Sequence, residues 1–232
     1  MILKKYEQLP ENLKNEEVKK YYDILSKKKV SLVIKRAFDI IVSLILLILL
    51  SPIILILAIM IKIDSKGPVF YRQERITTYG KIFKIFKFRT MVQNADKVGT
   101  LVTVGNDSRI TKVGKLIRKV RLDELPQLIN VLKGEMTFVG TRPEVKKYVD
   151  KYTDEMKATL LMPAGITSVA SIKYKDEDEI LEQAKQKGKD IDLAYVEDVL
   201  PEKMRYNLEY ISKFSFWYDI KVCIDTVIGV LR

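Results

Sequence analysis

Residues 40–61 read IIVSLILLILLSPIILILAIMI, a run of 22 positions without a charged side chain. As one continuous helix this run would be roughly 33 Å long, enough to cross the hydrocarbon core of a bilayer. It does not have the position of a secretory signal, because a long polar and charged segment precedes it. The run therefore predicts a membrane segment. The alternative is the buried central helix of a soluble domain.

Two features of this run predict that it enters and leaves the membrane on one side. Pro52, in the central Ser51-Pro52 pair, has no N–H and clashes with the carbonyl of Ile48, so the helix should kink or break there. Cations flank both ends of the run, whereas a spanning helix normally has one end that is poorer in them. They are Lys27, Lys28, Lys29, Lys35 and Arg36 before it, and Lys62, Lys66, Arg72 and Arg75 after it. We therefore expect a re-entrant helix with both ends cytosolic, rather than a straight span.

The composition of the chain limits its chemistry and its partners. In 232 residues it has 41 Lys+Arg against 30 Asp+Glu, no His and one Cys. The lack of His excludes His-based acid–base catalysis, Ser–His and Cys–His nucleophiles and His-ligated zinc. A single Cys excludes an intrachain disulfide. The net charge of +11 indicates a polyanionic partner: nucleic acid, nucleotide phosphates or an anionic membrane surface.

The chain divides into three parts around the membrane segment. Residues 1–30 are rich in Lys and Glu and are expected to form a polar arm, either a surface helix or a frayed segment. Residues 31–64 hold the re-entrant helix, and residues 65–232 are expected to form a compact cytosolic catalytic domain. Within that domain, residues 176–198 carry nine acidic residues against three lysines, which predicts a solvated acidic flap. The expected fold is α+β and mostly helical, with a helix–break–helix in the membrane, a few short strands and amphipathic helices at the membrane interface.

Local patterns predict the elements of the domain. PVFYRQERI and KIFKIFKFRTM are expected to pair as strands, although their alternation of basic and aromatic residues also suits a nucleic-acid surface or a membrane-interface belt. Helices are expected at 110–120, at 123–133 with Gly134 as the stop, and from Arg142-Pro143 onward, and a strand is expected at 166–174. The aromatic C-terminal segment suits either a helix along a membrane interface or a core helix.

The segment RKVRLDELPQ, residues 118–127, is the densest candidate site. One interpretation is structural, with Asp123 as the N-cap of a helix. The other is chemical: a carboxylate at a helix N-terminus beside Arg118 and Arg121 should stay ionised and can serve as a nucleophile or metal ligand. Asp123 and Glu124 can also hold Mg²⁺, a hard cation that accompanies diphosphates. Adjacent residues on a helix point in different directions, so the two acids are expected to divide these roles.

Three further cations are candidates for binding phosphate. Arg142 stands just before Pro143 at an expected helix start, and Lys87 and Arg89 lie in KFRTM. Taken individually, each of the three fits an ordinary surface cation better than a phosphate-binding residue.

Six segments of the chain resemble, in order, the bacterial sugar transferases, which are the monotopic phosphoglycosyl transferases. They are KRAFDIIVSLILLILLSP, GPVFYRQER, KIFKIFKFRTM, RLDELPQLINVLKGEMTFVGTRPE, PAGIT and SFWYDIK, and they run from about Lys35 to the C-terminus. The long block that contains DELPQL is the most specific of them.

The resemblance implies a reaction and a place for it. A sugar-1-phosphate would pass from a UDP-sugar to polyprenyl (undecaprenyl) phosphate, with Mg²⁺, at the cytoplasmic face of the bacterial inner membrane. Asp123 would attack the β-phosphate, expel UMP and form a phosphosugar–enzyme intermediate, which the polyprenyl phosphate then attacks. Glu124 would act with Mg²⁺ and the reacting phosphates, and Arg118 and Arg142 would bind the substrate. The membrane element implied is a re-entrant helix broken at Ser-Pro.

Other functions and partners remain to be separated from this one. The competing functions are a membrane-anchored module that binds anionic lipid or nucleic acid, and a membrane phosphohydrolase with Asp123 as its nucleophile. For the transferase, membrane lipids are expected partners and nucleic acid is not. The sequence leaves the oligomeric state open, a homodimer included. Thr77, Thr141 and the segment 168–174 depart from the family pattern, which affects the expected sugar specificity more than the chemistry.

Overall fold

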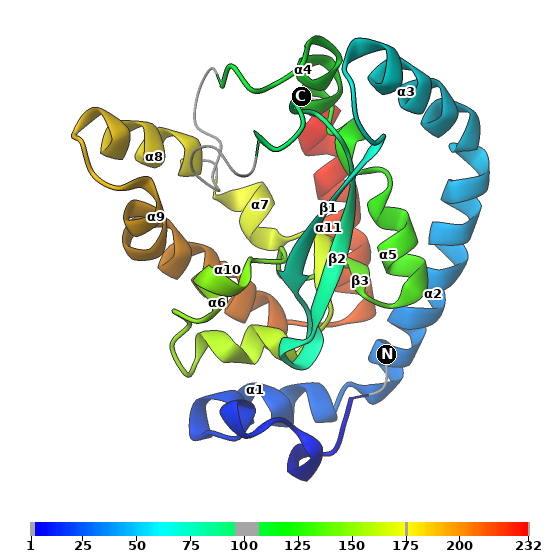
Figure 1. Ribbon diagram of the computed structural model, residues 1–232. Coiled ribbons are helices and arrows are strands. Elements are labelled where there is room, and N and C mark those ends of the chain that lie inside the picture. Colours follow the sequence, from blue (N-terminus) through cyan, green and yellow to red (C-terminus); the bar gives the residue numbers. More distant parts are fainter. Residues whose placement is uncertain (1–2, 96–106, 175, 232) are drawn as a thin grey trace.

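The computed structural model describes residues 3–95, 107–174 and 176–231. Helices dominate this part of the chain, and its strands form two small two-stranded sheets (Figure 1). The predicted fold, mostly helical with a few short strands, is confirmed. Helices α2 (Lys29–Leu49) and α3 (Ser51–Asp64) form an arc along one side, and helix α8 (Glu177–Gln186) lies on the opposite side (Figure 1).

The N-terminal arm is folded against the domain. Two short 3-10 turns, Tyr6–Gln8 and Glu11–Leu13, precede helix α1 (Glu16–Ser26), whose N-cap Asn15 accepts a hydrogen bond from the backbone N–H of Val18 (2.8 Å). Five apolar side chains of the arm are buried in the main core: Leu3, Leu9, Leu13, Val18 and Leu25. The helical alternative for this arm therefore holds, and the frayed one does not.

Helices α2 and α3 meet at an angle of 61° around Leu50. Pro52 lies in the first turn of α3, where its missing N–H leaves no bond unmade within that helix. The Ser51 hydroxyl donates a hydrogen bond to the carbonyl of Ile48 (2.8 Å), the group that an N–H at position 52 would bond in a continuous helix. The predicted break at Ser51-Pro52 is confirmed. Among the described residues no single helix is both long and apolar enough to cross a membrane. The bent pair of α2 and α3, taken together, has the length and composition to do so.

The polarity of α2 is inverted relative to a helix of a soluble protein. Its buried positions include Lys35, Asp39 and Ser43 besides Leu32, whereas most of its aliphatic side chains and many of those of α3 are exposed. The exposed ones include Ile41, Ile45, Ile48, Leu49, Leu55, Ile56 and Ile59. Soluble monomers rarely carry a continuous apolar face of this extent.

Charged residues of α2 fasten it to the domain. Lys35 donates from Nζ to Asp219 Oδ2 (2.5 Å) and to the carbonyl of Val139 (2.8 Å). Arg36 donates to the last carbonyls of helix α5 (Gln127–Lys133), those of Val131 (2.6 Å) and Leu132 (2.9 Å). These two flanking cations therefore serve tertiary contacts. Exposed lysines still remain at both ends of the bent pair: Lys27, Lys28, Lys29, Lys62 and Lys66.

The predicted strand pair is an antiparallel hairpin. β1 (Phe70–Ile76) and β2 (Ile82–Phe88) pair from Phe70 opposite Phe88 to Ile76 opposite Ile82, around a short turn at Thr78–Gly80. The second sheet pairs β3 (Met136–Val139) in parallel with β4 (Ala164–Thr167). Val131 of α5, Phe83 and Ile85 of β2 and Met136 of β3 share one apolar cluster, so the hairpin, α5 and the second sheet form one unit.

The region expected to be helical at 110–133 consists of two helices with a turn between them. Helix α4 (Lys112–Lys119) begins after Thr111, whose hydroxyl accepts from the N–H of Gly114 (3.0 Å). A 3-10 turn, Leu122–Glu124, then precedes α5. Gly134 ends α5 in the left-handed conformation (φ 82°), as predicted. The expectation that Asp123 caps a helix is wrong, because the N-cap of α5 is Pro126.

The expected helix from Arg142-Pro143 is wrong. Residues 141–145 belong to no helix, and helix α6 is a single turn, Lys146–Val149. A residue before proline is disfavoured in the helical region, and this segment is bonded to β1, where the carbonyl of Glu144 accepts from the N–H of Ile76 (3.0 Å). A 3-10 segment, Met156–Leu161, connects it to β4.

The expected strand at 166–174 is correct only for Ile166 and Thr167 and wrong for the rest of the segment. β4 ends at Thr167, and Ser168 then caps helix α7 (Val169–Lys173) by accepting a hydrogen bond from the N–H of Ser171 (3.0 Å). A serine cap outweighed the strand-like composition of this segment.

The acidic segment and the C-terminus are helical. Helix α8, helix α9 (Ile191–Ala194) and a π-helical turn (Tyr195–Val199) place Leu181, Ala184 and Ile191 in the core and most of their acids outside. Helix α10 (Leu200–Ser212) is a core helix. Helix α11 (Phe216–Leu231) exposes Trp217, Ile224, Val227 and Ile228, and for it the interface alternative remains a prediction.

Candidate active site

A cleft of about 590 Å³ opens beside the β1–β2 hairpin. Its walls come from both strands, from the chain that follows β2, and from the turn between α4 and α5. Its described lining residues include six cations and one acid, Asp123; the cations are Arg72, Arg75, Lys87, Arg89, Arg109 and Arg118. Such a cleft attracts a polyanion and strengthens its binding by excluding water.

Asp123 is held in the cleft wall by its apolar neighbours. Arg121 adopts the left-handed backbone conformation (φ 58°), which turns the chain out of α4. Leu122 and Leu125, on either side of the two acids, pack with Ile61 of α3 and other members of one apolar cluster. Asp123 itself is only 9% exposed. Within the described residues its carboxylate has neither a hydrogen-bond donor nor an ion-pair partner, and it faces the cleft.

Glu124, in contrast, is neutralised by two cations. Its Oε1 accepts from Lys87 Nζ (2.8 Å) and from Arg142 Nη2 (2.6 Å), and its Oε2 lies 3.4 Å from Arg142 Nη1. Lys87 comes from β2 and Arg142 from the segment after β3. Glu124 thus joins the hairpin, the 3-10 turn and the second sheet at one point.

Burial affects the two neighbouring acids differently. For Asp123, burial raises the pKa of the carboxyl group and the charge of Glu124 adds to this, against the attraction of Lys87 and Arg118. For Glu124, burial opposes ionisation, but Arg142 and Lys87 outweigh it and hold the pKa well below its usual range. Burial thus acts against the ionised form of Asp123, and the expectation that this carboxylate stays ionised remains a prediction. A poorly solvated carboxylate without donors is more nucleophilic when ionised.

The family model of the bacterial sugar transferases matches residues 30–232 of this chain. The chain belongs to this family. The match begins where α2 begins and includes both the bent helix pair and the cleft. The predicted resemblance is confirmed.

Named relatives support this membership. The UDP-glucose:undecaprenyl-phosphate glucose-1-phosphate transferase of Klebsiella pneumoniae is 39% identical over 85% of this chain and 40% of its own length. The UDP-N-acetylgalactosamine-undecaprenyl-phosphate N-acetylgalactosaminephosphotransferase of Aeromonas hydrophila is 35% identical over 85% of this chain and 44% of its own. The uncharacterized sugar transferase EpsL of Bacillus subtilis is 34% identical, over 86% of this chain and 88% of EpsL. The chain therefore spans less than half of the first two relatives and most of the third.

The structure of this bacterial sugar transferase brings most of the predicted site residues together. Asp123 and Glu124 are adjacent, Lys87 and Arg142 bind Glu124, and Arg118 lines the same cleft as Asp123. These contacts join segments that are separated by up to about fifty residues in the chain, which strand and helix patterns alone do not predict.

Arg89 is turned away from the acids, toward α3. Its Nη2 donates to the carbonyl (2.7 Å) and hydroxyl (2.9 Å) of Ser65, and its Nη1 donates to the carbonyl of Lys66 (2.9 Å). Gly67 lies against this guanidinium, since a Cβ there would come within 1.9 Å of Arg89 Nη1. Although Arg89 lines the cleft, these contacts hold its guanidinium at the junction between β2 and the end of α3, and its role in binding phosphate remains a prediction.

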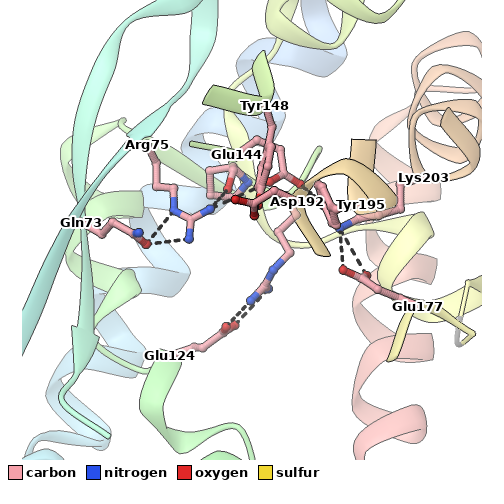
Figure 2. A network of polar contacts seen from close by, with 11 residues as sticks. Gln73, Arg75, Glu124, Glu144, Tyr148, Glu177, Asp192, Tyr195 and Lys203 are labelled. Atoms are coloured by element: carbon pink, nitrogen blue, oxygen red, sulfur yellow. Dashed lines mark hydrogen bonds and ion pairs between the residues drawn. The ribbon is translucent and has the colours of Figure 1, made fainter. Parts of the chain in front are cut away.

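Sequence reasoning missed Arg75 as a site residue. Arg75 lines the cleft from β1, where it donates to Gln73 Oε1 (2.6 Å) and to the carbonyl of Pro143 (3.1 Å) (Figure 2). Burial lowers its pKa. The hairpin register puts Gln73 and Arg75 on the same face of the sheet as Lys87. Strand alternation could therefore have identified Arg75 as a site residue, but only with the pairing of the two strands known.

The residues present fit Mg²⁺ only as an ion shared with a substrate. The described residues contain no group of three or more acidic, Cys or His side chains suited to a metal. Both oxygens of Glu124 face cations, which leaves Asp123 as the acid in the cleft with free oxygens. Mg²⁺ commonly binds through one or two carboxylates together with substrate phosphates, and this donor set suits that mode.

Proposed function

We propose that this chain transfers a sugar-1-phosphate from a UDP-sugar to undecaprenyl phosphate and releases UMP. The observation that carries the proposal is the buried carboxylate of Asp123, which has no hydrogen-bond or ion-pair partner among the described residues and lies in a cleft lined by cations. Family membership and the printed names of the relatives, which act on UDP-sugars and undecaprenyl phosphate, support the choice of substrates.

The proposed chemistry has two displacements at one phosphorus atom. An oxygen of Asp123 attacks the β-phosphorus of the UDP-sugar, the bond from that phosphorus to the bridging oxygen breaks, and UMP leaves with the electron pair. A phosphate oxygen of undecaprenyl phosphate then attacks the same phosphorus, and the Asp123 carboxylate leaves. Neither displacement needs a general base, because every attacking group is already an anion. This agrees with a chain that has no His.

The cations of the cleft have separate proposed tasks. Arg118 and Arg75 line the space in which the diphosphate would lie and balance its charge. Glu124 holds Lys87 and Arg142 in place, so we assign it a positioning role toward these two cations. Mg²⁺ held by Asp123 and the diphosphate would supply further charge neutralisation when it is bound.

We propose that α2 and α3 form a re-entrant membrane element at the cytoplasmic face of the bacterial inner membrane. The inverted polarity of α2, the 61° bend and the exposed lysines at both ends support this proposal. Exposed apolar side chains on α4 (Leu116) and α11 (Trp217, Val227) support further contact with the interface. A lipid acceptor confined to the same surface would raise its effective concentration at the cleft.

The test is UMP release from a panel of UDP-sugars with and without undecaprenyl phosphate, for the wild type and Asp123→Asn. We expect release that is sustained only with the lipid, and none above background with Asp123→Asn, which should still bind UDP. Sustained release without lipid would instead indicate a phosphohydrolase. Equal release by Asp123→Asn would contradict the assignment of Asp123.

A further inference from the structure

A second cavity, of about 130 Å³, lies beside the cleft, and we call it the side pocket. It is lined by Arg75, Arg142, Glu144, Tyr148, Glu177, Tyr195 and Lys203, together with Pro143 and Val145. Arg75 lines both cavities. Arg142 in its wall is the ion-pair partner of Glu124, the residue next to Asp123. The side pocket therefore shares the wall residue Arg75 with the cleft and is linked through Arg142 to the acid next to Asp123.

The polar groups of the side pocket are held in fixed positions by one another. Glu144 is 6% exposed, and its Oε1 accepts from the hydroxyl of Tyr195 (2.5 Å) and lies 3.5 Å from Lys203 Nζ (Figure 2). Lys203 also donates to the Tyr195 hydroxyl (2.8 Å) and pairs with Glu177 (3.3 Å). The rings of Tyr148 and Tyr195 lie 4.6 Å apart. This rigid wall of alternating donors and acceptors costs little further ordering when a ligand binds.

We infer that the side pocket binds the sugar ring of the donor, an inference that rests on the proposed function. The sugar is bonded to the phosphate that Asp123 is proposed to attack, so the ring must lie next to Asp123. Of the two described cavities that share Arg142, Pro143 and Glu144 in their walls, only the side pocket has room for a sugar ring, because the other holds about 10 Å³. Its volume is far below that of pockets for larger ligands, and it suits one hexose ring rather than a nucleoside.

The charges that line the side pocket favour an uncharged sugar over a phosphate. Glu144 and Glu177 line it beside the cations, whereas the cleft has Asp123 as its single acidic lining residue among those described. Carboxylates repel a diphosphate but accept hydrogen bonds from sugar hydroxyls, and Lys203 and the tyrosine hydroxyls complete the set of donors and acceptors. The diphosphate therefore belongs in the cleft and the uncharged ring in the side pocket.

Glu177 is the residue of the side pocket best placed to select among sugars. It is the first residue of α8, and its side chain is 31% exposed, so it can reach a ligand without leaving a buried network. Glu144 and Lys203 are instead committed to each other and to Tyr195. A carboxylate at this position favours a sugar with a hydroxyl directed toward it, and disfavours its epimer.

The test measures binding by the full chain in detergent with Mg²⁺, by calorimetry. The ligands are UDP and the UDP conjugates of glucose, galactose, N-acetylglucosamine and N-acetylgalactosamine. The variant is Glu177→Gln, and the matched control is Glu182→Gln, the same change at an exposed position of the same helix. We expect Glu177→Gln to weaken the preferred UDP-sugar by about tenfold and to leave UDP within about twofold, because UDP lacks the ring. The control should match the wild type for every ligand.

Three results would overturn the inference. If Glu177→Gln weakened the binding of UDP and of the UDP-sugars equally, the side pocket would bind the nucleotide. If it changed the binding of no ligand, the side pocket would not bind the donor. A wild type that binds no UDP-sugar would overturn both this inference and the proposed function. A wild type that binds UDP-sugars with the expected Glu177 dependence but releases no UMP would contradict the proposed function and leave the sugar site standing.

Discussion

At the scale of single residues, the site depends on the contrast between two adjacent carboxylates. Glu124 is compensated by Lys87 and Arg142, whereas Asp123 has no partner among the described residues. A compensated acid is a poor nucleophile, and a free acid in a cationic cleft is a good one. The order of the pair in the sequence does not reveal this division of roles. It follows from the elements that each side chain faces.

The compensated state of Glu124 leads to a prediction about stability. Glu124→Gln leaves Lys87 and Arg142 close together without their common counter-charge, so we expect a loss of about 3 kcal/mol in the free energy of unfolding. The measurement is thermal unfolding in detergent followed by circular dichroism. The control is Glu74→Gln, which removes an exposed pair with Lys84 (3.8 Å) and should cost under about 1 kcal/mol. Equal effects of the two changes would show that Glu124 does not organise the site.

At the scale of elements, the catalytic turn and the membrane helix are built as one piece. Leu57 and Ile61 of α3 share an apolar cluster with Phe88 of β2 and Ile117 of α4. Arg89 closes the C-terminal end of α3, and Arg36 of α2 binds the C-terminal carbonyls of α5. Helices α2 and α3 therefore both contact elements that flank Asp123 in the chain. A shift of these two helices would move the turn that carries Asp123.

Arg89→Lys tests whether this residue joins elements or binds substrate. One ammonium group cannot reach both Ser65 and Lys66 as the guanidinium fork does, so we expect a loss of about 2 kcal/mol in stability. The affinity for UDP, measured by calorimetry, should change by less than about twofold. Arg205→Lys, at an exposed pair with Glu202, is the control and should alter neither quantity. If Arg89→Lys left stability unchanged but greatly weakened UDP binding, Arg89 would be a phosphate-binding residue.

Pro52→Ala tests the origin of the bend. The new N–H can bond the carbonyl of Ile48, so we expect a straighter helix whose N-terminal end lies on the opposite side of the membrane. The measurement is labelling by an impermeant thiol reagent in spheroplasts, with Cys223→Ser as background and Lys27→Cys or Lys66→Cys as the reporter.

The labelling experiment has two informative comparisons. With Pro52 present, both reporters should be protected, and labelling of either one would contradict the re-entrant topology. With Pro52→Ala, we expect the Lys27→Cys reporter to become labelled. Continued protection would show that the bend has another cause, such as the clamps made by Lys35 and Arg36.

At the scale of the whole molecule, the core is continuous from the N-terminal arm to the last helix. One apolar cluster contains Leu13 and Leu25 of the arm, Val139 of β3, Tyr210 of α10 and Val222 of α11. Buried polar contacts reinforce it, since Asp219 accepts hydrogen bonds from both Lys35 and the Tyr210 hydroxyl (2.6 Å). The arm, which showed no chemistry in the sequence, therefore has a structural task.

Leu13→Ala measures how much the arm contributes. Leu13 is fully buried, so we expect a loss of about 3 kcal/mol in the free energy of unfolding, from lost apolar contact and the cavity left behind. Leu193→Ala, at a position 48% exposed, is the matched control and should cost under about 1 kcal/mol. If both changes cost the same in thermal unfolding, the arm does not belong to the cooperative core.

Features with a local cause could be predicted from the sequence. The break at Ser51-Pro52, the strand hairpin and the stop at Gly134 follow from the missing proline N–H, from alternation, and from the freedom of glycine at positive φ. Features with a distant cause could not. From the sequence, Lys35 is a cation that flanks the membrane segment and Arg89 is a candidate for binding phosphate. Their contacts with Asp219 and Ser65 are known only from the structure. The same holds for Asp123, whose pKa depends on burial by chain segments far away in the sequence.

The measurement that tests the proposed mechanism most directly is mass analysis of the chain after rapid quenching with its preferred UDP-sugar and Mg²⁺, in the absence of lipid. We predict an increase in mass by one sugar phosphate, on the peptide that contains Asp123. The adduct should disappear when undecaprenyl phosphate is added, and Asp123→Asn should never acquire it. Release of UMP without any adduct on the wild type, or with the adduct on another residue, would contradict a covalent role for Asp123.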